Sequence, residues 1–238
     1  MDRFVAKLRS RQALSEDDES LLRQAAWTSR RYERHDVIVR AGERLESAHL
    51  LLSGFAARAQ EDSAGNRQIV GLCLAGDLID IHGVVLGRME QEIVALSLCE
   101  VASIPHAQVR ALSLGSSSLL RTFALQGAID HAIQAAWIQA LNSKRGTAKV
   151  GHLFCEMQLR LGLVGLATQM GFPLPLSQQE LADFTGMTHV HLNRCLKELR
   201  ASGLLSFQQG WAKVLDWEGL KRLAHFDEAY LNLRLIEG

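Results

Sequence analysis

Residues 176–205 read LSQQELADFTGMTHVHLNRCLKELRASGLL and predict two short helices in tandem. Ser177 with Glu180 three residues later is typical of a capping box, in which each side chain accepts a hydrogen bond from a backbone N–H at the start of a helix. Gly186 is expected to end this helix, because glycine adopts positive φ without strain. Thr188 can cap the second helix. Two such helices joined by a tight glycine turn form a helix-turn-helix.

The second helix, which is expected to run to about residue 201, has two different faces. One face carries Val190, Arg194 and Lys197, flanked by His191 and Asn193. The opposite face is apolar and holds Leu192, Cys195, Leu196 and Leu199. The polar face suits a major groove, because arginine bonds guanine, asparagine bonds adenine and a small apolar group contacts the thymine methyl. An ordinary amphipathic helix with a solvated polar face is the alternative, and the residues that follow favour the first interpretation.

A small β-hairpin, or wing, is predicted after the second helix, with residues 204–207 and 211–215 flanking Gln208-Gln209-Gly210. This order resembles the winged helix-turn-helix of the Crp/Fnr transcription regulators. The matching residues are Gln179, Leu181, Ala182, Gly186, Thr188, Arg194, Leu196, Leu199 and Gly203-Leu204-Leu205. The resemblance implies DNA contacts by Ser177, Gln178, Thr188, His189, Val190, His191, Asn193, Arg194 and Lys197. Arg194 matches the family's guanine-reading arginine, whereas Val190 departs from the glutamate of well-known members.

The amino-acid composition limits the classes to which the protein can belong. The 238 residues are 47% hydrophobic and carry no formal net charge. Residues 175–215 hold four basic against three acidic side chains, so DNA affinity must come from the placement of charge and from two copies acting together. No apolar run has the length of a signal peptide or a membrane span. The four cysteines form no C-x-x-C pair, which favours buried, reduced thiols in a cytoplasmic protein.

The sequence of residues 1–105 predicts helix followed by short strands. Residues 1–28 look helical, and Ser15 followed by Asp18 is a capping signal. Residues 31–105 alternate short apolar runs with turns, which is typical of a small antiparallel barrel or jelly roll. The expected strands are 37–39, 48–52, 55–60, 67–74, 92–98 and 100–104, with turns at Gly42, Gly54, 62–66 and Gly76-Asp77. The spacing of these glycines resembles the cyclic-nucleotide-binding β-roll of the same family.

The roll departs from the family where a ligand would bind. Cyclic-AMP-binding members surround the nucleotide with a Gly-Glu pair and an Arg-Ser pair, and the expected Arg-Ser falls here on Met89 and Glu90. Methionine cannot pair a phosphate and Glu90 would repel it, so no cyclic nucleotide is expected. Asp80, His82 and Arg88 are the candidate effector-pocket residues. A haem bound through His82 is the alternative to a structural loop histidine, which is favoured. No cofactor and no metal site are expected.

A long helical pattern follows the roll at residues 117–142. Its apolar stripe consists of Leu119, Leu120, Phe123, Ile129, Ile133, Ala136, Trp137 and Ala140. Such a stripe can be core or a seam with a partner, and the resemblance implies that it pairs two subunits. Residues 142–147 are expected to form a hinge, and residues 148–168 a further helix.

The sequence therefore predicts an α+β chain with three parts: an amino-terminal antiparallel β-roll sensor domain at 1–116, a dimerisation helix and hinge at 117–145, and a winged helix-turn-helix at 146–238. The expected function is sequence-specific binding of a palindromic DNA site as a homodimer, with RNA polymerase as a partner implied by the resemblance. A small-molecule or haem sensor with weak or lost DNA binding is the alternative. No phosphate-binding glycine loop, nucleophile elbow or metal quartet indicates an enzyme. The effector and the target genes cannot be read from the sequence.

Overall fold

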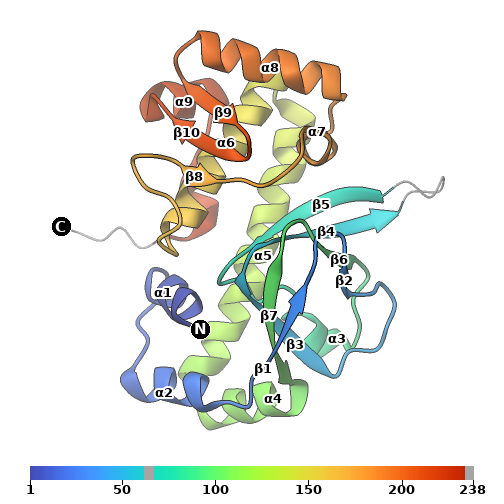
Figure 1. Cartoon of the computed structure of the whole chain (residues 1–238). Coiled ribbons are helices and arrows are strands. Elements are labelled where there is room, and N and C mark those ends of the chain that lie inside the picture. Colours follow the sequence, from blue (N-terminus) through green and yellow to red (C-terminus); the bar gives the residue numbers. More distant parts are fainter. Residues whose placement is uncertain (62–66, 234–238) are drawn as a thin grey trace. The chain divides into compact units, whose positions relative to one another are not determined.

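The computed structural model describes residues 1–61 and 67–233. The chain divides into two compact units, Met1–His131 and Ala132–Leu231 (Figure 1). The turn predicted at 62–66 lies outside the described residues. Within the described ranges, no helix combines the length and the apolar character needed to cross a membrane.

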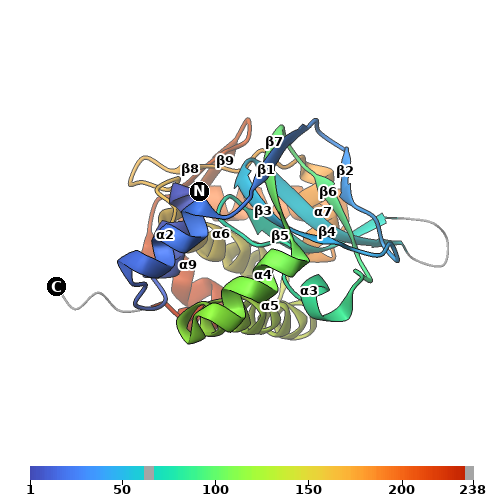
Figure 2. The ribbon, with the colours of Figure 1, turned by 90° about the horizontal axis from the view of Figure 1, so that it is seen from below.

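The first unit is a β-roll made of two antiparallel sheets, which confirms the predicted architecture. One sheet has the strand order β1–β7–β3 and the other β2–β6–β4–β5. The strands are β1 (Thr28–Tyr32), β2 (Val37–Val39), β3 (Ser47–Ser53), β4 (Phe55–Glu61), β5 (Arg67–Leu74), β6 (Glu92–Ala95) and β7 (Cys99–Pro105). The helices of this region are α1 (Asp2–Arg9), α2 (Glu16–Gln24), α3 (Gly83–Leu86) and α4 (His106–Gly115). Figure 2 shows the strands of both sheets on one side of α4.

Most of the predicted strands are confirmed, with three differences. Strand β6 ends at Ala95 rather than at residue 98, because the chain bends there before β7 begins. Strand β1 and the helices α3 and α4 were not predicted. Four of the five residues of β1 are exposed at the edge of the sheet, so its sequence TSRRY lacks the apolar alternation that marks a strand.

The two sheets share one core. Leu51 and Val101 of the first sheet pack with Ala56 and Ile93 of the second. Met89 is fully buried in the same cluster, so its side chain faces the core of the roll rather than a ligand. A second cluster joins the amino-terminal helices to the roll; it includes Phe4, Leu8, Leu22, Leu50, Ile104, Leu119 and Phe123.

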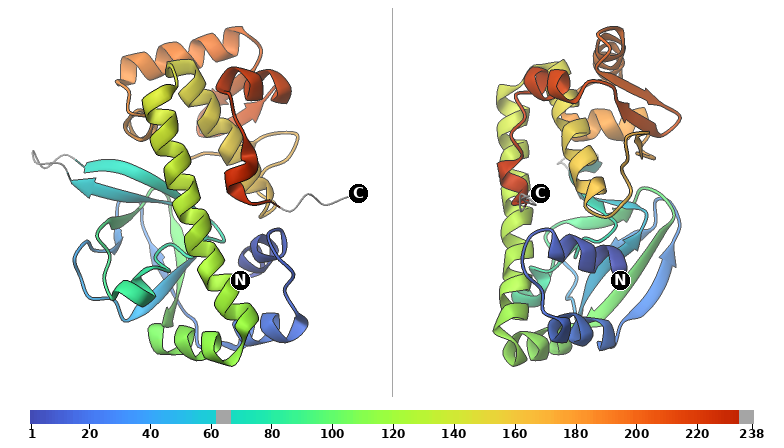
Figure 3. Two further views of the ribbon diagram at one scale, coloured as in Figure 1. Left: turned by 180° about the vertical axis from the view of Figure 1, so that it is seen from behind. Right: turned by 90° about the vertical axis from the view of Figure 1, so that its left-hand side faces the viewer.

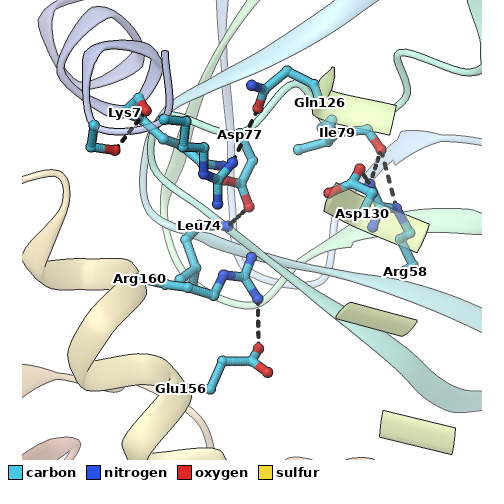
Figure 4. Close-up of polar contacts among 11 residues, drawn as sticks. Lys7, Arg58, Leu74, Asp77, Ile79, Gln126, Asp130, Glu156 and Arg160 are labelled. Atoms are coloured by element: carbon cyan, nitrogen blue, oxygen red, sulfur yellow. Dashed lines mark hydrogen bonds and ion pairs between the residues drawn. The ribbon is translucent and has the colours of Figure 1, made fainter. Parts of the chain in front are cut away.

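A buried ion pair holds α1 against the Gly76-Asp77 turn that follows β5. Lys7 Nζ pairs with the carboxylate of Asp77, which also accepts a hydrogen bond from the backbone N–H of Leu74 at 2.9 Å (Figure 4). Gly76 has φ of 90°, which confirms the predicted Gly-Asp turn. The amino-terminal helices therefore belong to the folded unit.

Helix α5 (Ser117–Ser143) is one unbroken helix, as Figure 3 shows from behind, and confirms the long helical pattern. Its predicted apolar stripe, however, faces mainly inward. Leu119, Phe123, Ile129, Trp137 and Ala140 are buried within the chain itself. The stripe residues that keep exposed surface are Leu120, Ile133 and Ala136, and the pairing of two subunits along α5 stays a prediction.

Polar side chains interrupt the buried face of α5 once per turn. Thr122, Gln126 and Asp130 are four residues apart, and each bonds a residue of the first unit. Figure 4 shows the bonds of Gln126 and Asp130. Their partners are Gln12 Nε2 for Thr122 Oγ1, Arg11 Nη1 for Gln126 Oε1 at 3.4 Å, and Arg58 Nη2 for Asp130 Oδ2 at 2.7 Å. Because each of the three bonds requires its own pair to be aligned, the set specifies the register of α5 on this unit.

The second unit is a winged helix-turn-helix with flanking helices, as predicted. Its elements after α5 are α6 (Gly146–Gly162), β8 (Phe172–Pro173), α7 (Gln178–Thr185), α8 (His189–Ala201), β9 (Leu205–Gln208), β10 (Trp211–Val214), α9 (Trp217–Ala224) and η1 (Glu228–Leu231). Helix α6 begins at Gly146 and ends at Gly162, earlier than the predicted residue 168. The expected hinge at 142–147 is therefore reduced to Lys144 and Arg145.

Candidate nucleic-acid interface

The first helix of the motif begins at the predicted capping box. The backbone N–H of Glu180 donates to Ser177 Oγ at 3.1 Å, and the N–H of Ser177 donates to Glu180 Oε2 at 2.6 Å. The helix ends at Gly186, whose φ is 62°. Gln178, the first residue of α7, is exposed. These local signals determine where α7 begins and ends, and therefore where the next helix can begin.

Helix α8 begins at Thr188, whose hydroxyl accepts a hydrogen bond from the N–H of His191 at 3.2 Å. Leu192, Cys195 and Leu199 are buried and hold the helix on the unit. Because this anchoring face is apolar, the opposite face is presented to solvent.

The exposed face of α8 carries the predicted row. Val190 is 79% exposed, and Arg194 and Lys197 are exposed one and two turns further along. The nearest acid to Arg194 is Glu198, at 3.8 Å, which is too long for a hydrogen bond. The guanidinium of Arg194 can therefore turn both of its N–H edges toward a ligand.

Two other predicted residues interact with each other on α8. His189 is exposed, and the side-chain amide of Asn193 lies 3.4 Å from its ring nitrogens. This contact at i, i+4 orients Asn193, which is half-buried, along the first turn of the helix.

His191 lies differently from its neighbours. Its ring is half-buried and turned toward Gly146, the first residue of α6. A Cβ atom at Gly146 would lie 2.3 Å from His191 Nε2 and 2.8 Å from Cys195 Sγ. A side chain at residue 146 would therefore require the His191 ring and the Cys195 sulfur to shift.

The predicted wing is a true hairpin. Trp211 pairs with Gln208, and Gln209 and Gly210 turn the chain with φ of 50° and 73°. Arg200 Nη2 donates to the carbonyl of Phe207 at 3.1 Å, which ties the end of α8 to the wing. The tip carries amides rather than cations, so it can donate hydrogen bonds but adds no positive charge.

The end of α5 packs on the first helix of the motif. The ring of Trp137 lies 4.3 Å from that of Phe184 on α7, and its Nε1 donates to Glu156 Oε2 at 2.9 Å. A Cβ at Gly186 would be in van der Waals contact with Leu141, 3.5 Å away. The last turns of α5 are thus part of the scaffold that holds the motif, a role that the apolar pattern alone did not predict.

The connection between α5 and α6 is held by Lys144. Its Nζ donates to the carbonyls of Ala224 at 2.6 Å and His225 at 2.9 Å, and lies 3.1 Å from His152 Nδ1. Burial lowers the pKa of this lysine. Burial and the Lys144 ammonium also lower the pKa of His152 to about 3, so the imidazole is neutral and accepts from Lys144. Because all three donors of the ammonium face acceptors, the connection is fixed rather than free.

The network continues to a fully buried carboxylate, Glu156. Tyr230 OH donates to Glu156 Oε2 at 2.7 Å. Arg160 Nη1 donates to Glu156 Oε1 at 2.9 Å, as Figure 4 shows. Burial and this carboxylate raise the pKa of Tyr230. Three donors, from Trp137, Arg160 and Tyr230, thereby meet the two oxygens of Glu156 inside the unit.

The candidate effector-pocket residues differ in their burial. Asp80 is fully buried and accepts from the backbone N–H of His49 at 2.7 Å, with His49 Nδ1 2.6 Å from its other oxygen. His82 is half-buried, and burial lowers its pKa. Arg88 is exposed. Asp80 thus serves the fold through His49, and of the three only His82 and Arg88 reach solvent.

Arg58 is a buried charged residue that sequence reasoning missed. Its guanidinium donates to the carbonyl of Ile79, from Nε at 3.2 Å and from Nη2 at 2.9 Å, and pairs with Asp130. Burial opposes the charged form, but the Asp130 carboxylate outweighs it and holds the pKa of Arg58 above its ordinary value. A single arginine in the run FAARAQ and a single aspartate in AIDHAI were the available signals.

The four cysteines are buried free thiols, as predicted. Burial raises the pKa of Cys155 to about 12, so its thiolate is not populated at neutral pH. In the part of the chain that the structure describes, no three His, Cys, Asp or Glu side chains are grouped to hold a metal ion.

Comparison with known proteins bears on both units. Residues 29–114 match the cyclic nucleotide-binding domain, and residues 148–223 match the Crp-like helix-turn-helix domain. The cAMP-activated global transcriptional regulator Vfr of Pseudomonas aeruginosa is 29% identical over 191 residues, which span 74% of this chain and 84% of that protein. FixK2 from Bradyrhizobium japonicum has a similar structure, with a TM-score of 0.73, 20% identity and coverage of 83% of this chain and 97% of that chain. The c-di-GMP responsive regulator CLP of Xanthomonas campestris has a TM-score of 0.65 at 18% identity, covering 85% of this chain and 100% of that chain.

Proposed function

Because the chain belongs to the Crp/Fnr family of transcription regulators and has its helix-turn-helix DNA-binding domain, we propose that it binds a palindromic DNA site as a homodimer, with α8 of each copy in a major groove. The exposed row of Val190, Arg194 and Lys197 on α8 is the observation that carries this proposal. The apolar side of the same helix is anchored, so the row is presented on a rigid element.

Within each half-site, the side chains have different roles. Arg194 bonds the two major-groove acceptors of a guanine, since Glu198, with which it pairs, lies 3.8 Å away, beyond hydrogen-bonding distance. Val190 contacts a thymine methyl, because valine cannot accept the amino proton of cytosine. Lys197, Ser177, Gln178 and Thr188 lie at exposed positions where they bond phosphates and fix the register of the duplex. His189 and Asn193 approach the bases beside Val190 as a pair.

The homodimer seam in this proposal is the exposed face of α5. That face carries Ile138 at 63% and Leu120 at 54% exposure, with the exposed alanines Ala124, Ala128 and Ala135 and the exposed His131 between them. Small residues allow two helices to approach closely, and a second copy would cover the two large apolar side chains. A symmetric pair of helices would place two copies of α8 for grooves about one turn, or ~34 Å, apart.

The effector in this proposal is not a cyclic nucleotide. Met89 is buried in the core of the roll and Glu90 is exposed, so neither offers a partner to a phosphate. Relatives of this fold differ in their signals, since Vfr is described as cAMP-activated and CLP as c-di-GMP responsive. RNA polymerase is the protein partner that the family implies for the DNA-bound dimer.

Selection of bound sequences from a random DNA pool tests the proposal directly. The expected result is one sequence with two-fold symmetry whose half-sites lie about one helical turn apart. Sedimentation of the protein with and without the selected DNA should give two chains per site. A monomer that binds an asymmetric single site equally well would overturn the proposal, and so would the recovery of no sequence at all.

A further inference from the structure

His191 of α8 lies against Gly146, the first residue of α6. The space that a Cβ at residue 146 would need is taken by the His191 ring and the Cys195 sulfur, at 2.3 Å and 2.8 Å. Cys195 is buried on the anchored side of α8, one turn after His191. The imidazole therefore occupies the space between α6 and α8.

The residues on either side of this contact are held firmly. Gly146 follows Lys144, whose ammonium is bonded to Ala224, His225 and His152. His191 follows Val190 directly and precedes Arg194 by three residues, so it shares the first turns of α8 with the exposed row. A change in how the ring sits on Gly146 would tilt those turns relative to α6.

We propose that His191 is a positioning residue that sets the tilt of α8 through Gly146, so that base discrimination by Val190 and Arg194 depends on a side chain that does not touch DNA. This inference rests on the proposed function of α8. It gives His191 a different role from its neighbours His189 and Asn193, which share the same helix but lie away from Gly146.

The test compares base-substitution binding profiles of full-length variants on the selected site. Gly146→Ala adds a methyl group where the ring lies, and should raise the Kd for the best site on the order of tenfold while flattening the preference among bases. Gly162→Ala is the matched control, because Gly162 lies in the same helix and, among the described residues, its new Cβ would meet nothing within 4 Å beyond its own turn of the helix. This control should keep the wild-type profile.

The double variant Gly146→Ala/His191→Ala separates positioning from direct contact. His191→Ala alone leaves a gap that loosens α8 and should also flatten the profile. In the double variant the alanine methyl at 146 occupies part of the space left by the ring, so the profile should recover toward wild type. If His191 contacted DNA instead, the double variant would bind no better than His191→Ala, and the inference would be overturned.

Two further outcomes are distinguishable. A wild-type protein that binds no DNA from the pool refutes the proposed function itself. A wild-type protein that binds its site, with Gly146→Ala and Gly162→Ala giving the same profile, refutes only the role of His191. Melting temperatures of all variants, measured in parallel, show whether a flattened profile arises in a folded protein.

Discussion

The guanidinium of Arg58 and the carboxylate of Asp130 form an ion pair within the first unit, with Nη2 2.7 Å from Oδ2 and the arginine side chain only 6% exposed. Asp130→Asn would leave a buried charge beside a neutral amide. We expect the free energy of unfolding to fall by about 3 kcal/mol, since breaking one partner of a buried pair is strongly destabilising. Urea denaturation followed by circular dichroism measures the change.

The exposed pair Arg40–Glu43, with 67% and 60% of the side chains exposed and 3.7 Å between its charged atoms, provides the control for this prediction. Glu43→Gln should leave the unfolding curve nearly unchanged, because exposed pairs contribute little. Equal effects of the two substitutions would show that Arg58–Asp130 does not hold α5 on the roll.

Arg194→Ala should act differently from Lys197→Ala. Loss of the arginine should cost roughly 1–3 kcal/mol per half-site and relax the preference at one symmetric position. Loss of the lysine should weaken binding to all sequences alike and reduce the salt dependence. Titrations on a set of base-substituted sites at two salt concentrations distinguish the two. Uniform weakening by both variants would make Arg194 a backbone contact.

The buried His152 predicts a loss of stability in acid. Its pKa is about 3 in the folded protein, against an ordinary value of about 6.5 in the unfolded chain. The unfolded chain therefore takes up the proton first, and stability present above pH 6.5 is lost progressively as the pH falls toward 3. His152→Gln cannot take up this proton, so the pH slope of its unfolding free energy between 6.5 and 4 should be shallower. Parallel slopes for both proteins would contradict the prediction.

Ile138→Glu should weaken the dimer. A charge toward the carboxyl end of the exposed α5 face would lie in the proposed seam, and burying it without a partner is costly. We expect the dimer dissociation constant to rise at least about tenfold, or ~1.4 kcal/mol. Val85→Glu on α3, at a site 87% exposed, is the comparison. Sedimentation equilibrium that shows the same dissociation constant for wild type and Ile138→Glu would place the seam elsewhere.

Cyclic AMP should neither bind nor change DNA affinity, because the buried Met89 offers a phosphate no hydrogen bond. Isothermal calorimetry with cyclic AMP is the direct measurement. Micromolar binding that sharpens DNA affinity would show that a different part of the roll holds the nucleotide.

The sequence predicted those parts of the fold that are encoded locally. The capping box at Ser177, the turn at Gly186 and the hairpin after α8 are each determined by a few adjacent residues, and the structure confirms all three. The exposure of Val190 and Arg194 followed from helical periodicity in the same way.

Features that depend on distant residues were not predicted. Periodicity identifies an apolar stripe on α5 but cannot show whether Trp137 packs on Phe184 of the same chain or on a second copy. The inward turn of His191 depends on a glycine 45 positions earlier, and the pairing of Arg58 with Asp130 joins residues 72 positions apart. Such pairings arise from tertiary packing, which overrides what each segment would do alone.

The boundary between the two compact units falls inside α5, between His131 and Ala132, rather than at the loop of Lys144 and Arg145. This has a consequence for exchanging the amino-terminal unit between relatives. In a chimera joined at the loop, α5 would come from the other protein. Phe184 and Glu156 would then face a residue of that helix in place of Trp137. A chimera joined within α5, after His131, would carry Trp137, Leu141 and Lys144 along with the motif that they support. The second design should transplant DNA specificity intact, and the first should need compensating substitutions in the borrowed helix.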